Sequence, residues 1–351
     1  MSAPPVACNI YVSSGRSKHS SWLLNVLENA QKLCSSLRQE VNSTIVVVHA
    51  YADGPYDRSS FHIAGSPSSV VKVASTIAVQ SIQFMSERKK EYVETSETLC
   101  LKQELGSRHP FVGMVDHVSV LPLVDGTNAT TTLRNVHGTF DASPHGVAAI
   151  EIGNYLEGNT DVKVLYYGDA HPDNAPLSEV RRQQTDFFNT SGDEERKSTS
   201  LSDSDILENP GIVTVGAPAY FVENFNIRLT PKCNRKVARS LTRYLRERDG
   251  GLQGIEGLTL PYDGRYEMAG NLLRPDIVSS DVVLEKMDEW VDKTLKELSL
   301  KSKSDLIEKA YRVGTTSEMC LSVLKQSTSE EKMMKHDKEV MEQFQRFLSI
   351  Q

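Results

Sequence analysis

The sequence predicts an α/β (α+β, ferredoxin-like) protein of two subdomains, each a mixed β-sheet packed against helices. Three observations favour this class. Apolar residues recur at three- and four-residue spacing in several long stretches, as on one face of a helix. Short β-branched runs bounded by turn residues lie between those stretches, as strands do. The order strand–helix–strand–strand–helix then occurs twice in a chain of 351 residues, long enough for two or three ordinary domains.

In the first half, strands are predicted at 7–12, 44–50 and 59–64, and helices at 22–37 and 68–87. The segment 51–58 is rich in turn residues, so we expect the second and third strands to form a hairpin across it. This order indicates a split βαβ, ferredoxin-like unit. Further strands are expected at 115–123 and 162–167.

In the second half, the stretch 211–225 alternates small and β-branched residues, as a strand does. An amphipathic helix is expected at 234–248, strand-like segments at 255–260 and 266–272, and a helix at 280–298. The repeated element order predicts a second α/β subdomain. We place the boundaries at 6–215 for the first subdomain, 216–312 for the second and 313–351 for a helical tail. The Ser-rich, charged segment 189–209 is expected to be a flexible insertion.

Composition excludes several classes of function. The chain has 39 basic and 46 acidic residues and a net charge of -7, which argues against a nucleic-acid binder. No apolar stretch approaches the roughly 18 residues that a membrane span needs. The five cysteines include no CxxC pair and the histidines show no HExxH spacing, so we predict neither a disulfide framework nor a metal. We expect a cytoplasmic protein and leave open a homodimer.

One segment carries a recognisable motif. Residues 107–123 read SRHPFVGMVDHVSVLPL, in which His109-Pro110 precedes Gly113, Asp116 and an apolar strand that reaches Pro122. This resembles the His-Pro-Arg-x-Gly-x-x-Asp signature of the formiminotransferase family. The Val-Asp-His part resembles the plant-type, single-module members of that family.

Other family landmarks follow in order between about residues 7 and 290. They are Ser13-x-Gly15, Arg58, Leu165-Tyr166-Tyr167-Gly168, Arg181-Arg182, Gly216-Ala217, Phe225-Asn226-Ile227, Gly251-Leu252 and Asn271-Leu272. One such element is weak evidence, whereas the ordered set is strong evidence for the fold.

The resemblance implies a transferase that moves a one-carbon formimino or formyl group to N5 of tetrahydrofolate. Tetrahydrofolate and a small amino-acid-derived molecule would be its substrates, and the resemblance implies a ligand cleft between the two subdomains. It implies His109 as the general base, because N5 loses a proton as it attacks the one-carbon group. Candidate folate- and substrate-binding residues are Asp53, Arg58, Asp116, Arg182, Asn209, Pro210, Gly211, Gly216 and Asn271. Arg58, Arg181 or Arg182 would bind carboxylates of the glutamyl tail, and the backbone at 211–216 would approach the pterin.

Simpler interpretations stand beside these. Asp116 either orients the reacting ring or caps a loop, and His117 is interpreted as a core histidine with a hydrogen-bond partner. The glycines are interpreted as serving backbone geometry more than ligand contact. Asn271 is also typical of a turn or strand end, where its side chain hydrogen-bonds the backbone.

The chain departs from the family pattern in several places. Phe111 and Pro218 stand where the pattern has arginine, and the family's Asn-Phe-Ser-Glu-Gly is Tyr11-Val12-Ser13-Ser14-Gly15. Two alternative functions therefore remain open: a folate-binding protein without catalysis, and an interaction protein acting through 189–209 and the C-terminal tail.

Overall fold

The computed structural model describes residues 3–15, 21–41, 43–95, 112–123, 142–184 and 211–349. They divide into two compact units. The first contains the described residues up to 219 together with 317–349, and the second contains residues 220–316. Each is a mixed α/β unit with its own sheet and its own hydrophobic core, so the predicted fold class is confirmed.

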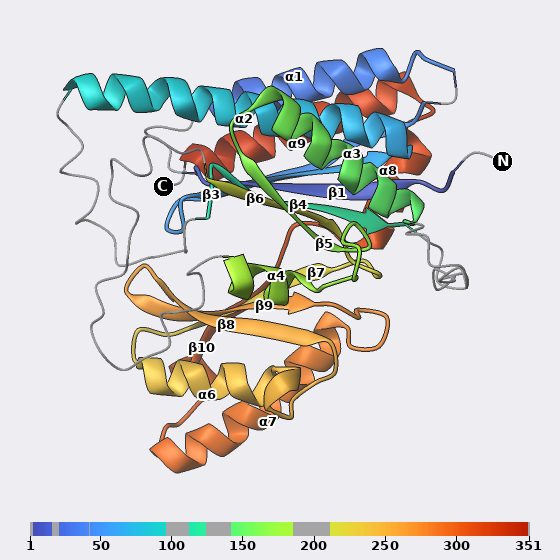
Figure 1. The fold of residues 1–351 in the computed structure, drawn as a ribbon. Helices are drawn as coiled ribbons and strands as arrows, with labels where there is room; N and C mark the ends of the chain where they lie inside the picture. Colours follow the sequence, from blue (N-terminus) through green and yellow to red (C-terminus); the bar gives the residue numbers. More distant parts are fainter. Residues whose placement is uncertain are drawn as a thin grey trace. The chain divides into compact units, whose positions relative to one another are not determined.

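The first unit holds a six-stranded sheet in the order β2-β3-β1-β4-β6-β5 (Figure 1). Its strands are β1 (Val6–Val12), β2 (Ile45–Asp53), β3 (Arg58–Gly65), β4 (Val115–Pro122), β5 (Lys163–Gly168) and β6 (Ile212–Ala217). Its helices are α1 (Trp22–Leu37), α2 (Pro67–Thr95), α3 (Pro144–Asn159), α4 (Leu177–Gln184), α8 (Ser317–Gln326) and α9 (Glu330–Ser349). The first four strands pair antiparallel, whereas β6 pairs parallel to both β4 and β5.

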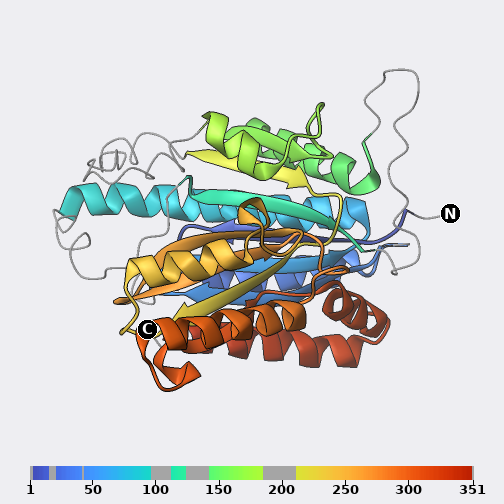
Figure 2. The same cartoon turned by 90° about the horizontal axis from the view of Figure 1, so that it is seen from below.

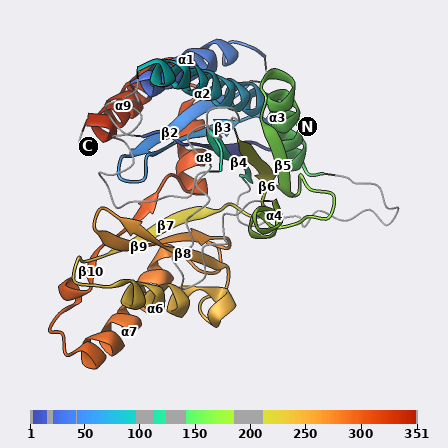
Figure 3. The same ribbon diagram turned by 60° about the vertical axis from the view of Figure 1, so that its left-hand side comes forward.

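Side-chain alternation along the strands gives this sheet two different faces. In β1, Cys8, Ile10 and Val12 belong to the core formed with α1, α2 and α3. Asn9 and Tyr11 lie between them and therefore point to the opposite face. Figure 3 shows α1 and α2 on the core face of the sheet, and α4 and α8 on the other. The opposite face is thus the polar face of the first unit.

The C-terminal helices pack on the first unit. Val340, Phe344 and Leu348 of α9 join the core, and the Phe344 ring lies 5.6 Å from that of Phe61 on β3. His336 adds a hydrogen bond to the Val47 carbonyl of the edge strand β2. In Figure 2, α8 and α9 lie at the margin of the unit opposite α3. The tail therefore covers the β2 edge, and such covering protects an edge from unwanted pairing.

The second unit holds a four-stranded antiparallel sheet in the order β10-β7-β9-β8. Its strands are β7 (Glu223–Leu229), β8 (Ile255–Tyr262), β9 (Arg265–Leu272) and β10 (Ile307–Val313). Helices α6 (Arg235–Leu245) and α7 (Ser280–Leu298) cover one face, and short 3₁₀ turns occur at Glu247–Asp249 and Lys303–Asp305. Both units thus contain strand–helix–strand–strand–helix–strand with the fourth strand beside the first, which is the ferredoxin-like arrangement.

Three features differ from the sequence expectation. The stretch 211–225, expected as one strand, contains β6 of the first sheet and the start of β7 of the second. Pro218 lies between them, and proline lacks the N–H that a continuing strand needs. Helix α3 and strand β10 were not predicted. Helix α3 has apolar and small residues around much of its surface, and β10 is an edge strand with charged residues, so neither shows a clear period.

Candidate functional site

The entry to β4 is fixed by close backbone contacts. Ser13 donates from Oγ to the Gly113 carbonyl at 2.5 Å, and from its amide to the Met114 carbonyl at 2.8 Å. Gly113 also forms an isolated antiparallel bridge with Gly211. A Cβ on Gly113 would lie 2.6 Å from the Ile212 carbonyl oxygen, so only glycine fits there. The chain that follows the predicted base is thereby held between β1 and β6.

Three of the predicted site residues, His109, Asn209 and Pro210, lie outside the described residues. The remaining predicted residues can be placed. Asp53, Arg58, Asp116, Arg182, Gly211 and Gly216 belong to the first unit, and Asn271 belongs to the second.

A buried charged cluster lies just inside β4. Asp116 occupies a bulge, because His117 pairs with Tyr11 and Val115 pairs with Val12, which leaves it as the extra residue. Its carboxylate lies 3.7 Å from Nε of Arg58. Asp116 is 3% exposed, so water screens this ion pair little. The structure thus brings together two predicted site residues that are 58 positions apart in the sequence.

Arg181 of α4 joins this cluster. Its Nη2 donates to the Asp116 main-chain oxygen at 3.1 Å and to Oγ1 of Thr214 at 2.9 Å. Burial lowers the pKa of both the Arg58 and Arg181 guanidiniums, and the negative charge of Asp116 opposes that effect. Arginine nevertheless remains protonated in proteins. Two cations, Arg58 and Arg181, therefore lie beside the Asp116 carboxylate. Arg182, the neighbour of Arg181, is exposed on α4.

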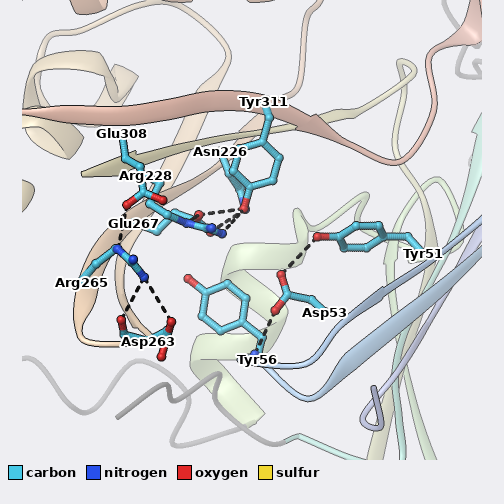
Figure 4. Close-up of polar contacts among 10 residues, drawn as sticks. All are labelled: Tyr51, Asp53, Tyr56, Asn226, Arg228, Asp263, Arg265, Glu267, Glu308 and Tyr311. Atoms are coloured by element: carbon cyan, nitrogen blue, oxygen red, sulfur yellow. Dashed lines mark hydrogen bonds and ion pairs between the residues drawn. The ribbon is translucent and has the colours of Figure 1, made fainter. Parts of the chain in front are cut away.

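The turn between β2 and β3 positions Arg58. Asp53 accepts hydrogen bonds from the Tyr56 amide at 3.0 Å and from the Tyr51 hydroxyl at 3.2 Å (Figure 4). Asp57 has a φ of 52° and accepts a hydrogen bond from the Gly15 amide at 2.8 Å. These contacts fix the turn that leads to Arg58.

The polar face of the sheet carries a hydrogen-bonded aromatic group. The rings of Tyr11 and His117 are stacked, with centroids 5.3 Å apart and planes 12° from parallel. His117 Nε2 lies 2.8 Å from the Tyr167 hydroxyl, which donates to Oγ of Ser119 at 2.8 Å. Burial, and then the charge of Arg181, lower the pKa of His117 well below its usual value. His117 is therefore neutral at physiological pH.

Gly216 makes room for this group. A Cβ there would lie 2.3 Å from a ring carbon of Tyr167. Gly211 has a φ of 91° and its bridge to Gly113 leaves no space for a side chain.

In the second unit, Asn271 accepts a hydrogen bond from Asn224 on the neighbouring strand at 2.8 Å.

The second unit has its own buried polar network (Figure 4). Asn226 and Arg228 alternate along β7 with the core residues of that strand, so the network lies on the face of the sheet away from the core. Glu267 is fully buried and accepts hydrogen bonds from Arg228 at 3.0 Å, Tyr311 at 2.7 Å and Asn226 at 2.9 Å. The Tyr262 ring lies 3.5 Å from the Arg228 guanidinium carbon, a cation–π contact.

These polar networks were not predicted from the sequence, although strand alternation carried a signal. Asn9 and Tyr11 alternate with apolar residues, as do Asn226 and Arg228. A period of two identifies residues on one face of a strand, but it does not tell which strands are neighbours.

Comparison with known proteins identifies the class. A family model described as the formiminotransferase domain, N-terminal subdomain, matches residues 5–218. This span exceeds half of the 351 residues, so the chain belongs to the formiminotransferase family. The family is one of folate-related one-carbon transferases. The resemblance seen in the sequence is thereby confirmed.

Two further comparisons add little. A comparison with curated proteins found no match. Among solved structures, a conserved protein from Enterococcus faecalis V583 is 8% identical, with 99% of this chain and 90% of that chain covered and a TM-score of 0.19. So low a score carries no argument.

In the described part of the chain, no helix is long and apolar enough to cross a membrane. Among those same residues, no group of three or more His, Cys, Asp or Glu side chains could hold a metal ion.

Proposed function

We propose that the protein is a transferase that moves a formimino or formyl group from a small amino-acid-derived donor to N5 of tetrahydrofolate. The family match supports the reaction class. The observation that carries the proposal for this chain is the buried cluster of Asp116, Arg58 and Arg181 at the start of β4, seven residues beyond His109 in the sequence.

His109 is the proposed general base. N5 attacks the carbon of the formimino group and loses its proton to the imidazole as the new C–N bond forms. When the bond from that carbon to the donor nitrogen breaks, the imidazolium returns the proton to the leaving nitrogen. Histidine suits both steps because its ordinary pKa lies near neutrality.

The charged cluster is proposed to bind a carboxylate of one substrate. A guanidinium offers paired N–H donors that match the two oxygens of a carboxylate. Arg181 is buried and the Arg58 side chain is only 15% exposed, and a low local dielectric strengthens such contacts. Asp116 is proposed to keep Arg58 oriented. Arg182 remains a proposed contact for an outer part of the glutamyl tail.

The other predicted residues keep more distant proposed roles. Gly211 and Gly216, with Asn209 and Pro210 just before them, would let the backbone approach the pterin. Asp53 would act by fixing the turn before Arg58, and Asn271 would contribute a hydrogen-bonding amide from the second unit.

Folate binding without catalysis is the second candidate. It is favoured by Phe111 and Pro218, which replace two arginines of the family pattern. A missing hydrogen-bond partner for a buried polar ligand costs about 1–3 kcal/mol each.

Titration of the purified chain with tetrahydrofolate and 5-formyltetrahydrofolate, followed by a transfer assay with formiminoglutamate, tests both candidates. We expect binding, and turnover that His109→Ala abolishes. Binding without turnover would favour the second candidate, and absence of any binding would refute both.

Matched arginine variants locate the carboxylate site. Arg181→Ala is expected to weaken binding of the glutamyl ligand about tenfold or more, because buried hydrogen bonds to a charge are the strong ones. Arg239→Ala on α6 is the control, outside the first unit. If Arg182→Ala weakens binding more than Arg181→Ala, the outer arginine is the principal ligand and the proposed cluster role is wrong.

A further inference from the structure

The polar face of the first sheet contains a buried hydrogen-bond acceptor, the side-chain oxygen of Asn9. Asn9 lies in the middle of β1, opposite Ser119 of β4 and His62 of β3. It is 3% exposed, and its Oδ1 atom has no hydrogen-bond partner among the residues that the structure describes. Most buried polar side-chain atoms have a partner, so each exception needs an explanation.

The amide orientation at Asn9 is set by its neighbour. The side chain hydrogen-bonds to Tyr11, two residues further on the same face of β1. The NH₂ group is directed to the Tyr11 oxygen, so Oδ1 is the side-chain atom that can still accept a hydrogen bond. Asn9 therefore presents an acceptor and not a donor.

A second acceptor lies beside it. The Tyr167 hydroxyl gives its one proton to Ser119, so its oxygen accepts from His117 Nε2. The His117 ring is neutral and therefore holds only that proton. Its Nδ1 atom consequently carries a lone pair that can accept a hydrogen bond, held in direction by the Tyr167 contact and by stacking on Tyr11.

Two acceptors on one face select the chemistry of a ligand. A carboxylate or phosphate offers only further acceptors and would be repelled there. A planar group with N–H donors satisfies both atoms, and the Tyr11 and His117 rings favour flat partners. This requirement is opposite to that of the arginine cluster, so the two places select different chemical groups.

The folate ligands of the proposed function have such a donor group in the 2-amino-4-oxopyrimidine edge of the pterin. Resting on that proposed function, we infer that Asn9 and His117 are specificity-determining residues that accept hydrogen bonds from the N–H groups of this edge. Tyr167 is a positioning residue, because it fixes which ring nitrogen of His117 accepts.

The test compares 5-formyltetrahydrofolate with an analogue whose 2-amino group is replaced by methyl, by calorimetric titration of the full chain. The wild type is expected to bind the amino ligand about 10- to 100-fold more tightly, since an unmet buried acceptor is costly. Asn9→Leu is expected to reduce this discrimination to about threefold or less, by weakening the amino ligand alone.

His117→Phe serves as the second variant, and Ser66→Ala, at an exposed hydrogen bond of the first unit, is the matched control. Unfolding midpoints establish that each variant is folded. If the wild type binds both ligands equally, or if Asn9→Leu and His117→Phe both keep the full discrimination, the inference is overturned while the proposed function stands. If the wild type binds neither ligand, both are wrong.

Discussion

The Glu267→Ala substitution is the sharpest test of the energetics, because Glu267 is fully buried and accepts three hydrogen bonds. Removing its carboxylate leaves the Arg228 guanidinium, itself 7% exposed, without its ion-pair partner. Breaking a buried pair by deleting one partner costs about 3–5 kcal/mol. We expect the free energy of unfolding of the second unit to fall by that amount.

The two tryptophans make the measurement specific. Trp290 packs in the core of the second unit, whereas Trp22 belongs to the core of the first. In a Trp22→Phe background, the fluorescence of Trp290 during urea titration reports on the second unit.

Glu308→Ala is the matched control. Glu308 also pairs with an arginine, Arg265, at 2.7 Å, but the two side chains are 35% and 27% exposed. Surface ion pairs contribute about 0–1 kcal/mol. If Glu267→Ala destabilises the unit by no more than Glu308→Ala does, the reasoning about burial is refuted.

Four further predictions concern the first unit. Gly216→Val should destabilise it by about 1–3 kcal/mol through overpacking, because a Cβ there meets an aromatic ring at 2.3 Å. Gly158→Ala, with open space in helix α3, should instead stabilise it by about 0.5–1 kcal/mol in the same urea titration. Burial, and then a nearby histidine, lower the pKa of His49 from 6.5 to about 4. Between pH 6.5 and about 4 the unfolded chain therefore binds a proton at His49 that the folded chain does not, so the free energy of unfolding should fall as the pH drops through this range. His49→Gln should flatten that decline, measured as urea midpoints at several pH values. Phe344→Ala should cost about 3–5 kcal/mol in thermal or urea unfolding, whereas Met334→Ala, at a side chain 69% exposed, should change stability by less than about 0.5 kcal/mol.

Strong periodicity made much of the fold predictable. The helices α1 and α7 and the hairpin of β2 and β3 were expected nearly at their observed bounds, because one face of each buries apolar residues. The edge strand β10 and helix α3 were missed because their patterns are weaker. The stretch 211–225 was assigned to one strand because sequence alternation continues across a change of sheet.

By itself, the sequence determined the family and the ferredoxin-like order, and it singled out Arg58 and Asp116. Those conclusions depend on local motifs and on short-range periodicity, which the order of residues contains. Only the tertiary structure showed that Arg181 and not Arg182 joins Asp116, and that Asn9 and His117 are neighbours on one polar face. The physical reason is that strand pairing brings together residues more than 100 positions apart, and the register of that pairing is fixed by packing of the whole sheet.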